Sequence, residues 1–299
     1  MSLDLIHAVS EPALLGESPM WHPQQQRLYW CDIPGRRLHR LDPVTGATRH
    51  WDFSCEVACC AAILGGGLLL GMRDGLWRFD PQASSRSQLA PPPYDPTVER
   101  FNDGKADAQG RFWVGTIYEP REPALAALYR WRPGELTRMA GDVTVANGLA
   151  WSIDGRTLYW SDTKAHVINA FDFDPSDGRL SGRRVFKQFA LKRPGQDLAD
   201  YGGRPDGAAV DAEGCYWVAM FEGQRVLRLS PKGEVLREVR LPVRCPTMLC
   251  FGGSDLRTLY ITTARENRPA AELAEQPLAG CLLAMRVDVP GLPTNLVRA

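Results

Sequence analysis

No part of this chain is dominated by charge of one sign. Its 35 lysines and arginines are matched by 35 aspartates and glutamates, and the formal net charge at pH 7 is +0. Proteins that bind nucleic acids or anionic membrane surfaces carry basic stripes or blocks, and the sequence has neither. We therefore expect no nucleic acid and no membrane as partner, while the sequence leaves the oligomeric state unknown.

Long hydrophobic runs are also missing. The N-terminal segment MSLDLIHAVSEP has no long apolar stretch and carries Asp4, so it does not resemble a signal peptide, and no later run could span a bilayer. We expect a cytoplasmic, reducing location in which the eight cysteines are thiols. Cys55, Cys59 and Cys60 cluster without a second CxxC or a CxxH, which favours small buried hydrophobic residues over a zinc site.

Long helical periodicity is absent, and short segments of alternating polarity take its place. They are rich in Trp, Tyr, Val and Leu and lie between Gly, Pro and Asp turns. The clearest unit predicts strands over 148–152, 157–162, 167–173 and 184–189. Turns at Asp154-Gly155 and Asp177-Gly178 separate the first two and the last two of these strands. This unit is a four-stranded meander.

The same unit recurs along the chain. The meander with Asn147 at its start aligns with five other segments, which start at Glu17, Cys59, Asn102, Asp206 and Thr247. Six repeated small sheets predict an all-β fold, a six-bladed β-propeller of four-stranded antiparallel blades, in one domain over residues 1–299. The last unit lacks a fourth strand. We expect residues 4–9 to supply it, because the N-terminal strand would then close the ring and remove an exposed edge.

Equivalent positions at the start of four of the six units carry carboxylate or amide side chains. In a propeller the first strand of each blade lines the central channel, so these positions form a ring at one channel mouth. Four of the six are Glu17, Asn102, Asn147 and Asp206. Two carboxylates at close quarters repel each other unless a cation lies between them. Oxygen donors suit calcium, magnesium or manganese, also iron(II), and zinc less well. Turn capping explains one such residue, but their recurrence favours a metal site.

Several long connections are predicted to return to the same mouth. They cover residues 91–99, 117–126, 190–204 and 264–279, and long loops on one face of a rigid scaffold are typical of a binding site. Arg100 lies two residues before Asn102 and so on the same face of an extended chain. Its alternative role is a surface salt bridge with Glu99 or Glu119. Tyr201 and Arg204 are conceivable contacts in the loop before Asp206.

Four stretches carry a resemblance to a known family. GESPMWH at Gly16, RFNDGKADAQGRFWVGT at Arg100, NGLAWSIDGRTLYWSDT at Asn147 and RPDGAAVDAEGCYW at Arg204 resemble the SMP-30/gluconolactonase family, which includes regucalcin and bacterial sugar-lactone hydrolases. The resemblance implies a single divalent metal ion. It also implies the roles of six side chains: metal ligands at Glu17, Asn147 and Asp206, and substrate contacts at Arg100, Asn102 and Glu119.

The expected activity is metal-dependent hydrolysis of a small-molecule sugar lactone to the aldonic acid. A metal ion polarises the lactone carbonyl and lowers the pKa of bound water, and Asp206 serves as ligand and general base. Arg100 and Asn102 orient sugar hydroxyls and stabilise the developing oxyanion. The metal is calcium, manganese, magnesium, iron(II) or zinc. The alternatives are a metal-dependent esterase or phosphotriesterase on the same scaffold, and a calcium-binding or protein-docking propeller without enzymatic activity.

Overall fold

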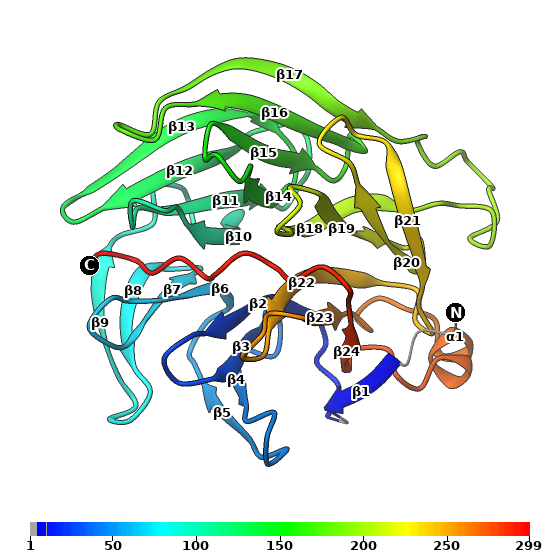
Figure 1. The fold of residues 1–299 in the computed structure, drawn as a ribbon, viewed down its shortest axis with the longest axis horizontal. Coiled ribbons are helices and arrows are strands. Elements are labelled where there is room, and N and C mark those ends of the chain that lie inside the picture. Colours follow the sequence, from blue (N-terminus) through cyan, green and yellow to red (C-terminus); the bar gives the residue numbers. More distant parts are fainter. Residues whose placement is uncertain (1–4, 10) are drawn as a thin grey trace.

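Six four-stranded antiparallel sheets surround a central channel in the computed structural model, which describes residues 5–9 and 11–299 (Figure 1). The first strand of each sheet is innermost, because it contacts the first strands of the two neighbouring sheets all the way round the ring. The predicted six-bladed propeller is therefore confirmed.

The first three blades follow one another along the chain. Their strands are β2 (Gly16–His22), β3 (Arg27–Asp32), β4 (Arg37–Leu41) and β5 (Thr48–Asp52) in blade one; β6 (Val57–Ala62), β7 (Leu68–Met72), β8 (Gly75–Asp80) and β9 (Ser85–Ala90) in blade two; and β10 (Glu99–Ala106), β11 (Phe112–Tyr118), β12 (Ala126–Arg132) and β13 (Glu135–Val143) in blade three.

Blades four to six continue the same order. Their strands are β14 (Ala146–Trp151), β15 (Thr157–Asp162), β16 (Val167–Phe173) and β17 (Leu180–Gln188) in blade four; β18 (Arg204–Val210), β19 (Tyr216–Phe221), β20 (Arg225–Leu229) and β21 (Val235–Arg240) in blade five; and β22 (Pro246–Gly252), β23 (Thr258–Thr263) and β24 (Leu282–Arg286) in blade six. The short helix α1 (Ala270–Glu275) lies in the β23–β24 connection.

The N-terminal strand closes the ring as expected. β1 (Leu5–Val9) pairs antiparallel with β24, and the sheet order β1-β24-β23-β22 makes it the fourth strand of blade six. The strand was expected over 4–9, and Asp4 lies outside the described residues. In blade four the two middle strands have the predicted bounds. Its first strand begins two residues earlier than predicted, so that Asn147 lies within it, and its last strand begins at Leu180 rather than at 184.

A repeated turn sequence explains two of the hairpins that face away from the ring of Glu17 and Asp206. DAQGRFW at Asp107 and DAEGCYW at Asp211 each place an aspartate six residues before a tryptophan. Both carboxylates accept a hydrogen bond from the indole Nε1 of that tryptophan at 2.8 Å, and each also accepts bonds from backbone N–H groups of its own turn. The buried Asp and Trp thus meet each other's hydrogen-bonding requirement, and the bonds from the Asp carboxylate to backbone N–H groups fix the turn.

Apolar side chains hold the blades to one another. The described residues form six apolar clusters, one at each interface between neighbouring blades. Seven of the cysteines are buried, Cys55 is partly buried, and no disulfide occurs in the described part of the chain. None of the helices described in residues 5–9 and 11–299 is long and apolar enough to cross a membrane.

Candidate functional site

The ring positions lie where each first strand departs from regular pairing. In all six blades the register between the first and second strands shifts at this level, for example between Glu17 and Met20 and between Pro205 and Ala208. Such bulges bend a strand and redirect its side chains. The irregularity therefore changes the direction of the side chains at the ring positions, Glu17, Asn147 and Asp206 among them.

Two glycines permit this backbone. Gly148 follows Asn147 and has φ +62°, a conformation that side-chain-bearing residues rarely adopt. Gly207 follows Asp206, and a Cβ placed on it would lie 2.8 Å from the Cα of Met248 in the next blade. The glycine after Asp206 is thus required by the close approach of blades five and six.

Glu17 and Asp206 bring two buried carboxylates to the ring. Glu17 and Asp206 are each 6% exposed. Glu17 accepts a hydrogen bond from the Ser18 N–H at 3.0 Å, whereas the Asp206 carboxylate accepts none from the described residues. Burial, and then the charge of Asp103, raise the pKa of Glu17 to about 8. Burial, and then the charge of Glu17, raise the pKa of Asp206 well above its usual range. Without a cation between them, the ionised carboxylates of Glu17 and Asp206 repel each other.

Asn147 and Asn102 belong to a chain of hydrogen bonds that crosses blades three and four. Arg100 Nη1 donates to Asn102 Oδ1 at 2.8 Å, Asn102 Nδ2 donates to Asn147 Oδ1 at 2.8 Å, and Asn147 Nδ2 donates to Thr163 Oγ1 at 2.8 Å. All four residues are buried. These hydrogen bonds fix the amide groups of Asn102 and Asn147, so the side-chain oxygen of Asn147 has a defined direction.

The donor set fits a hard divalent cation. Two buried carboxylates with unused acceptor capacity and one oriented amide oxygen are the ligand types that such ions prefer. Among the described residues no three His, Cys, Asp or Glu side chains form a metal-binding group, so a metal bound here depends on the amide oxygen of Asn147. A dication between Glu17 and Asp206 would also neutralise their mutual repulsion.

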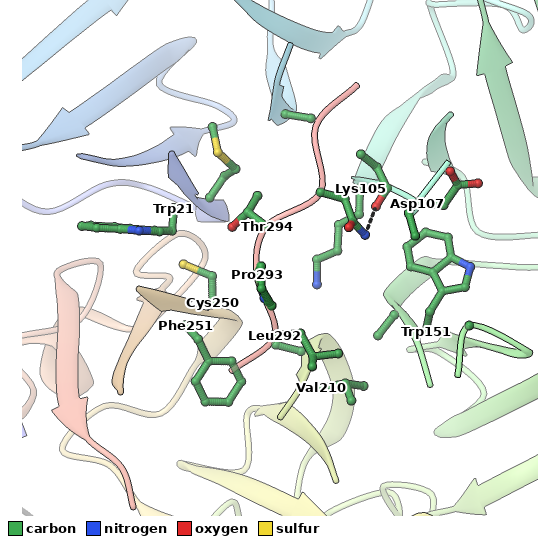
Figure 2. A pocket seen from close by; sticks show the side chains of 18 of the residues that line it. Trp21, Lys105, Asp107, Trp151, Val210, Cys250, Phe251, Leu292, Pro293 and Thr294 are labelled. Carbon is green, nitrogen blue, oxygen red and sulfur yellow. Dashed lines mark hydrogen bonds between the residues drawn. The ribbon is translucent and has the colours of Figure 1, made fainter. Parts of the chain in front are cut away.

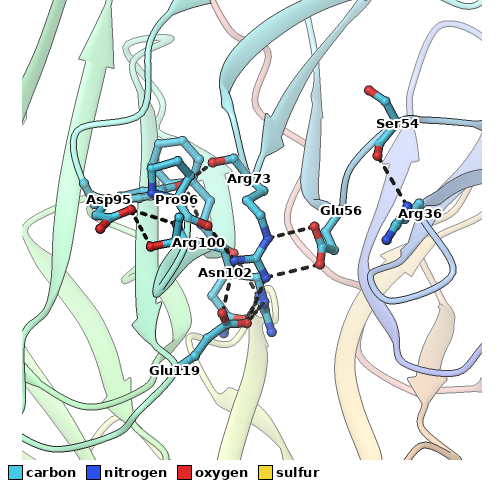
Figure 3. Close-up of polar contacts among 12 residues, drawn as sticks. Arg36, Ser54, Glu56, Arg73, Asp95, Pro96, Arg100, Asn102 and Glu119 are labelled. Carbon is cyan, nitrogen blue, oxygen red and sulfur yellow. Dashed lines mark hydrogen bonds and ion pairs between the residues drawn. The ribbon is translucent and has the colours of Figure 1, made fainter.

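Arg100 and Glu119 meet at the edge of the ring. Arg100 is 9% exposed, and its Nε lies 3.6 Å from Glu119 Oε1. Glu119 also binds Arg73 through both carboxylate oxygens, at 2.9 and 3.1 Å, and Arg73 binds Glu56 at 2.8 Å (Figure 3). Arg100 is thus a buried arginine that also reaches Asn102, and the expected alternative of a simple surface salt bridge does not describe it.

Sequence reasoning missed three charged residues of this region. Arg73 holds Glu119 and comes from the β7–β8 turn of blade two. Asp103 and Lys105 lie in the channel, where Asp103 Oδ2 accepts the Leu149 N–H at 2.8 Å and Lys105 donates to the Ala208 carbonyl. Both follow Asn102 in RFNDGK, and this second carboxylate beside a ring position was the available signal.

The ring and a large cavity occupy different parts of the channel. A cavity of about 530 Å³ is lined by the later residues of the first strands and by Leu292–Asn295 of the C-terminal segment, which crosses that end (Figure 2). Lys105 points into it, among largely apolar neighbours such as Trp21 and Phe251. The carboxylates of the ring lie on the other side of Lys105, at the mouth to which the long loops return.

Those long loops lie where the sequence predicts. The connections before β10 and β18, and those between β11 and β12 and between β23 and β24, all join strand ends at the level of the ring. In the connection before β18, Tyr201 is buried and its hydroxyl contacts His166 Nε2. The loop is thereby anchored to blade four close to the site.

Comparisons with known proteins agree with this architecture. A family model described as "SMP-30/Gluconolactonase/LRE-like region" matches residues 15–265. The chain is 47% identical over 284 residues to a 6-deoxy-6-sulfogluconolactonase of Pseudomonas putida, covering 95% of this chain and 94% of the relative. It is 35% identical to regucalcin of Oryctolagus cuniculus, covering 93% of both chains. A calcium-binding regucalcin from Agrobacterium tumefaciens superposes with a TM-score of 0.91 at 26% identity, over 99% of this chain and 98% of that one.

Proposed function

Because this chain belongs to the SMP-30/gluconolactonase/LRE-like family, we propose that it hydrolyses a sugar lactone to the aldonic acid at the ring of Glu17, Asn147 and Asp206. Two relatives are named as lactonases, and the 47% identical one is named for a sulfogluconolactone. The observation that carries the proposal is the juxtaposition of two buried, mutually repelling carboxylates with an oriented amide and a buried arginine at one channel mouth.

Glu17, Asn147 and Asp206 would hold one divalent metal ion. Calcium, magnesium and manganese suit this oxygen-donor set, iron(II) also fits, and zinc suits it less. When bound, such an ion supplies Lewis acidity, which polarises a carbonyl and makes water more acidic. The likeness to regucalcins favours calcium as the first ion to test.

Asp206 is proposed to act as general base as well as ligand. Its carboxylate accepts no hydrogen bond from the described residues, so one oxygen can bind the metal while the other accepts a proton from the attacking water. The water oxygen bonds to the lactone carbonyl carbon, the ring C–O bond breaks, and the proton passes to the ring oxygen to give the alcohol. No serine or cysteine nucleophile takes part.

Arg100 and Asn102 are proposed to position the substrate. The Nη2 group of Arg100 has no partner among the described residues, so it can donate to a sugar hydroxyl or to the developing oxyanion. The bond from Arg100 to Asn102 fixes the geometry of both side chains before substrate arrives. Glu119 is held by Arg73 beside Arg100, and in this proposal it accepts a hydrogen bond from a sugar hydroxyl.

The proposal is tested by restoring metals one at a time to chelator-treated protein and measuring acid release from aldonolactones. Asp206→Asn keeps a ligating oxygen but removes the base. We expect kcat at saturating metal to fall at least about 100-fold, the usual scale for a lost general base. Asn147→Ala is the matched variant, because it removes a ligand without removing the base. Near-normal kcat for Asp206→Asn would make Asp206 a ligand only.

A calcium-binding role without turnover is the second candidate, favoured by the likeness to a calcium-binding regucalcin. Aryl esters and phosphotriesters belong in the same assay, because a metal-dependent esterase or phosphotriesterase could use the same residues. Tight calcium binding with no hydrolysis of any lactone, ester or phosphotriester would support the binding role and refute the lactonase.

A further inference from the structure

One sector of the channel mouth carries more positive charge than its carboxylates can neutralise. We call Arg121, Lys192, Arg204 and Arg268 the cationic sector. They come from the β11–β12 connection, the connection before β18, the start of β18 and the β23–β24 connection. The β11–β12 connection reaches over blade four toward blade five, because Lys164 of the β15–β16 connection donates to the Arg121 carbonyl and the charges of Arg121 and Arg204 act on each other.

Arg204 connects this sector to the proposed metal ligands. It lies two positions before Asp206, at the start of the strand that carries Asp206 into the ring. Its guanidinium is 3.3 Å from Glu222 and 5.1 Å from the centre of the Phe221 ring, and its buried Nε has no hydrogen-bond partner among the described residues. Arg204 is thus a positioned cation with unused donor capacity directly beside Asp206.

A single carboxylate serves three of the four cations. Glu222 lies 3.3 Å from Lys192, 3.3 Å from Arg204 and 3.0 Å from Arg268. Arg268 also binds Glu272 through two bonds of 2.7 and 2.8 Å. Three cations therefore share two carboxylates, and one positive charge remains uncompensated.

Arg121 adds a second uncompensated charge. Its guanidinium makes no hydrogen bond or ion pair with any described residue, while its backbone carbonyl is held by Lys164 at 2.9 Å. Arg121 is an exposed residue; partial burial of its guanidinium, and then the charge of Arg204, lower its pKa, whereas Glu119 and Asp206 raise it. Arg121 therefore lies within electrostatic range of both Arg204 and the ring.

The opposite side of the mouth is balanced by comparison. Arg73 and Arg100 face Glu56 and Glu119 there, two cations against two carboxylates. A metal dication would likewise balance Glu17 and Asp206. The excess positive charge lies in the cationic sector, and an anion bound there would relieve the repulsion among its like charges.

We propose that the cationic sector binds an anionic substituent on the lactone, remote from the carbonyl that is attacked. This inference rests on the proposed lactonase activity. A sulfonate, phosphate or carboxylate would accept charge-assisted hydrogen bonds from Arg121 and Arg204, with Lys192 adding charge. The neutral end of the sugar would remain with Arg100 and Asn102. The sector thus selects lactones of charged sugars over neutral ones.

The test compares lactones that differ only at C6. D-glucono-1,5-lactone has a hydroxyl there, and its 6-phospho, 6-deoxy-6-sulfo and 6-carboxylate counterparts carry an anion. We expect kcat/KM at saturating metal to be at least about 10-fold higher for one or more of the anionic lactones. In Arg121→Gln with Arg204→Gln the ratio of anionic to neutral kcat/KM should fall about 10- to 100-fold. Arg179→Gln, an exposed arginine in the β16–β17 turn at the far end of its blade, should keep the wild-type ratio.

Calorimetric binding of gluconate and 6-phosphogluconate to the metal-loaded protein separates this inference from the enzymatic one. Tighter binding of 6-phosphogluconate that is lost in the double variant supports the subsite even if no lactone is hydrolysed. Equal affinity for the two acids, together with an unchanged kcat/KM ratio in the double variant, would overturn the subsite while leaving a neutral-lactone hydrolase intact.

Discussion

Without bound metal, the free energy of unfolding of this protein should decrease as the pH rises. In the metal-free state Glu17 and Asp206 are buried next to each other, and the folded protein keeps a proton on Glu17 up to a pKa of about 8, compared with 4.5 for an ordinary glutamate. Between these two values the unfolded chain has lost that proton and the folded chain still binds it. The free energy of unfolding therefore decreases with pH across this window.

The size of the effect follows from the shift of Glu17. One proton bound only by the folded state changes the free energy of unfolding by about 1.4 kcal/mol per pH unit. Over the window from 4.5 to about 8 the loss amounts to roughly 4–5 kcal/mol, a large part of a typical domain's stability. Asp206 acts in the same direction, because its pKa is also raised.

Bound metal should cancel this loss. The ion binds the ionised carboxylates, so its affinity rises with pH, and a ligand bound only by the folded state raises the free energy of unfolding. The measurement is urea unfolding at pH 5, 6.5 and 8, with chelator or with excess calcium. Glu17→Gln should flatten the pH dependence of the metal-free protein, and Glu275→Gln, an exposed residue of α1, should not. Metal-free protein that is equally or more stable at pH 8 than at pH 5 would refute the reasoning.

Three further outcomes are expected from the site. Asn147→Ala should bind metal at least about 10-fold more weakly by calorimetry, with kcat largely restored by excess metal, since it removes a ligand and not the base; failure of excess metal to restore kcat would argue against a ligand role. Arg100→Ala with Asn102→Ala should lower kcat/KM about 100-fold while elemental analysis finds normal metal content, and lost metal would instead make these residues ligands. Arg73→Ala should release Glu119 and raise KM several-fold more than it lowers kcat, and unchanged kinetics would show that Glu119 needs no anchor.

The fold followed from local patterns that one sequence contains. Alternation of apolar and polar residues between Asp-Gly turns predicted the two middle strands of blade four with the observed bounds, and the missing fourth strand of the last unit pointed to the N-terminus. Strand ends were less accurate, because β14 and β17 extend by pairing with neighbouring strands rather than by local preference. The ring of Glu17, Asn147 and Asp206 could be named for the same reason: position within a repeat fixes position around the axis.

The sequence by itself thus determined the propeller, its closure and the residues that begin its inner strands. Tertiary structure alone decided which charges are compensated. Arg73 neutralises Glu119 from another blade, Glu222 is shared by three cations, and Asp206 and Arg121 keep carboxylate and guanidinium groups without a partner among the described residues. Strand periodicity is set by neighbours one or two residues away in the sequence. The pairing of charges depends on side chains that loops from different blades bring together, and it therefore cannot be predicted from a local sequence pattern.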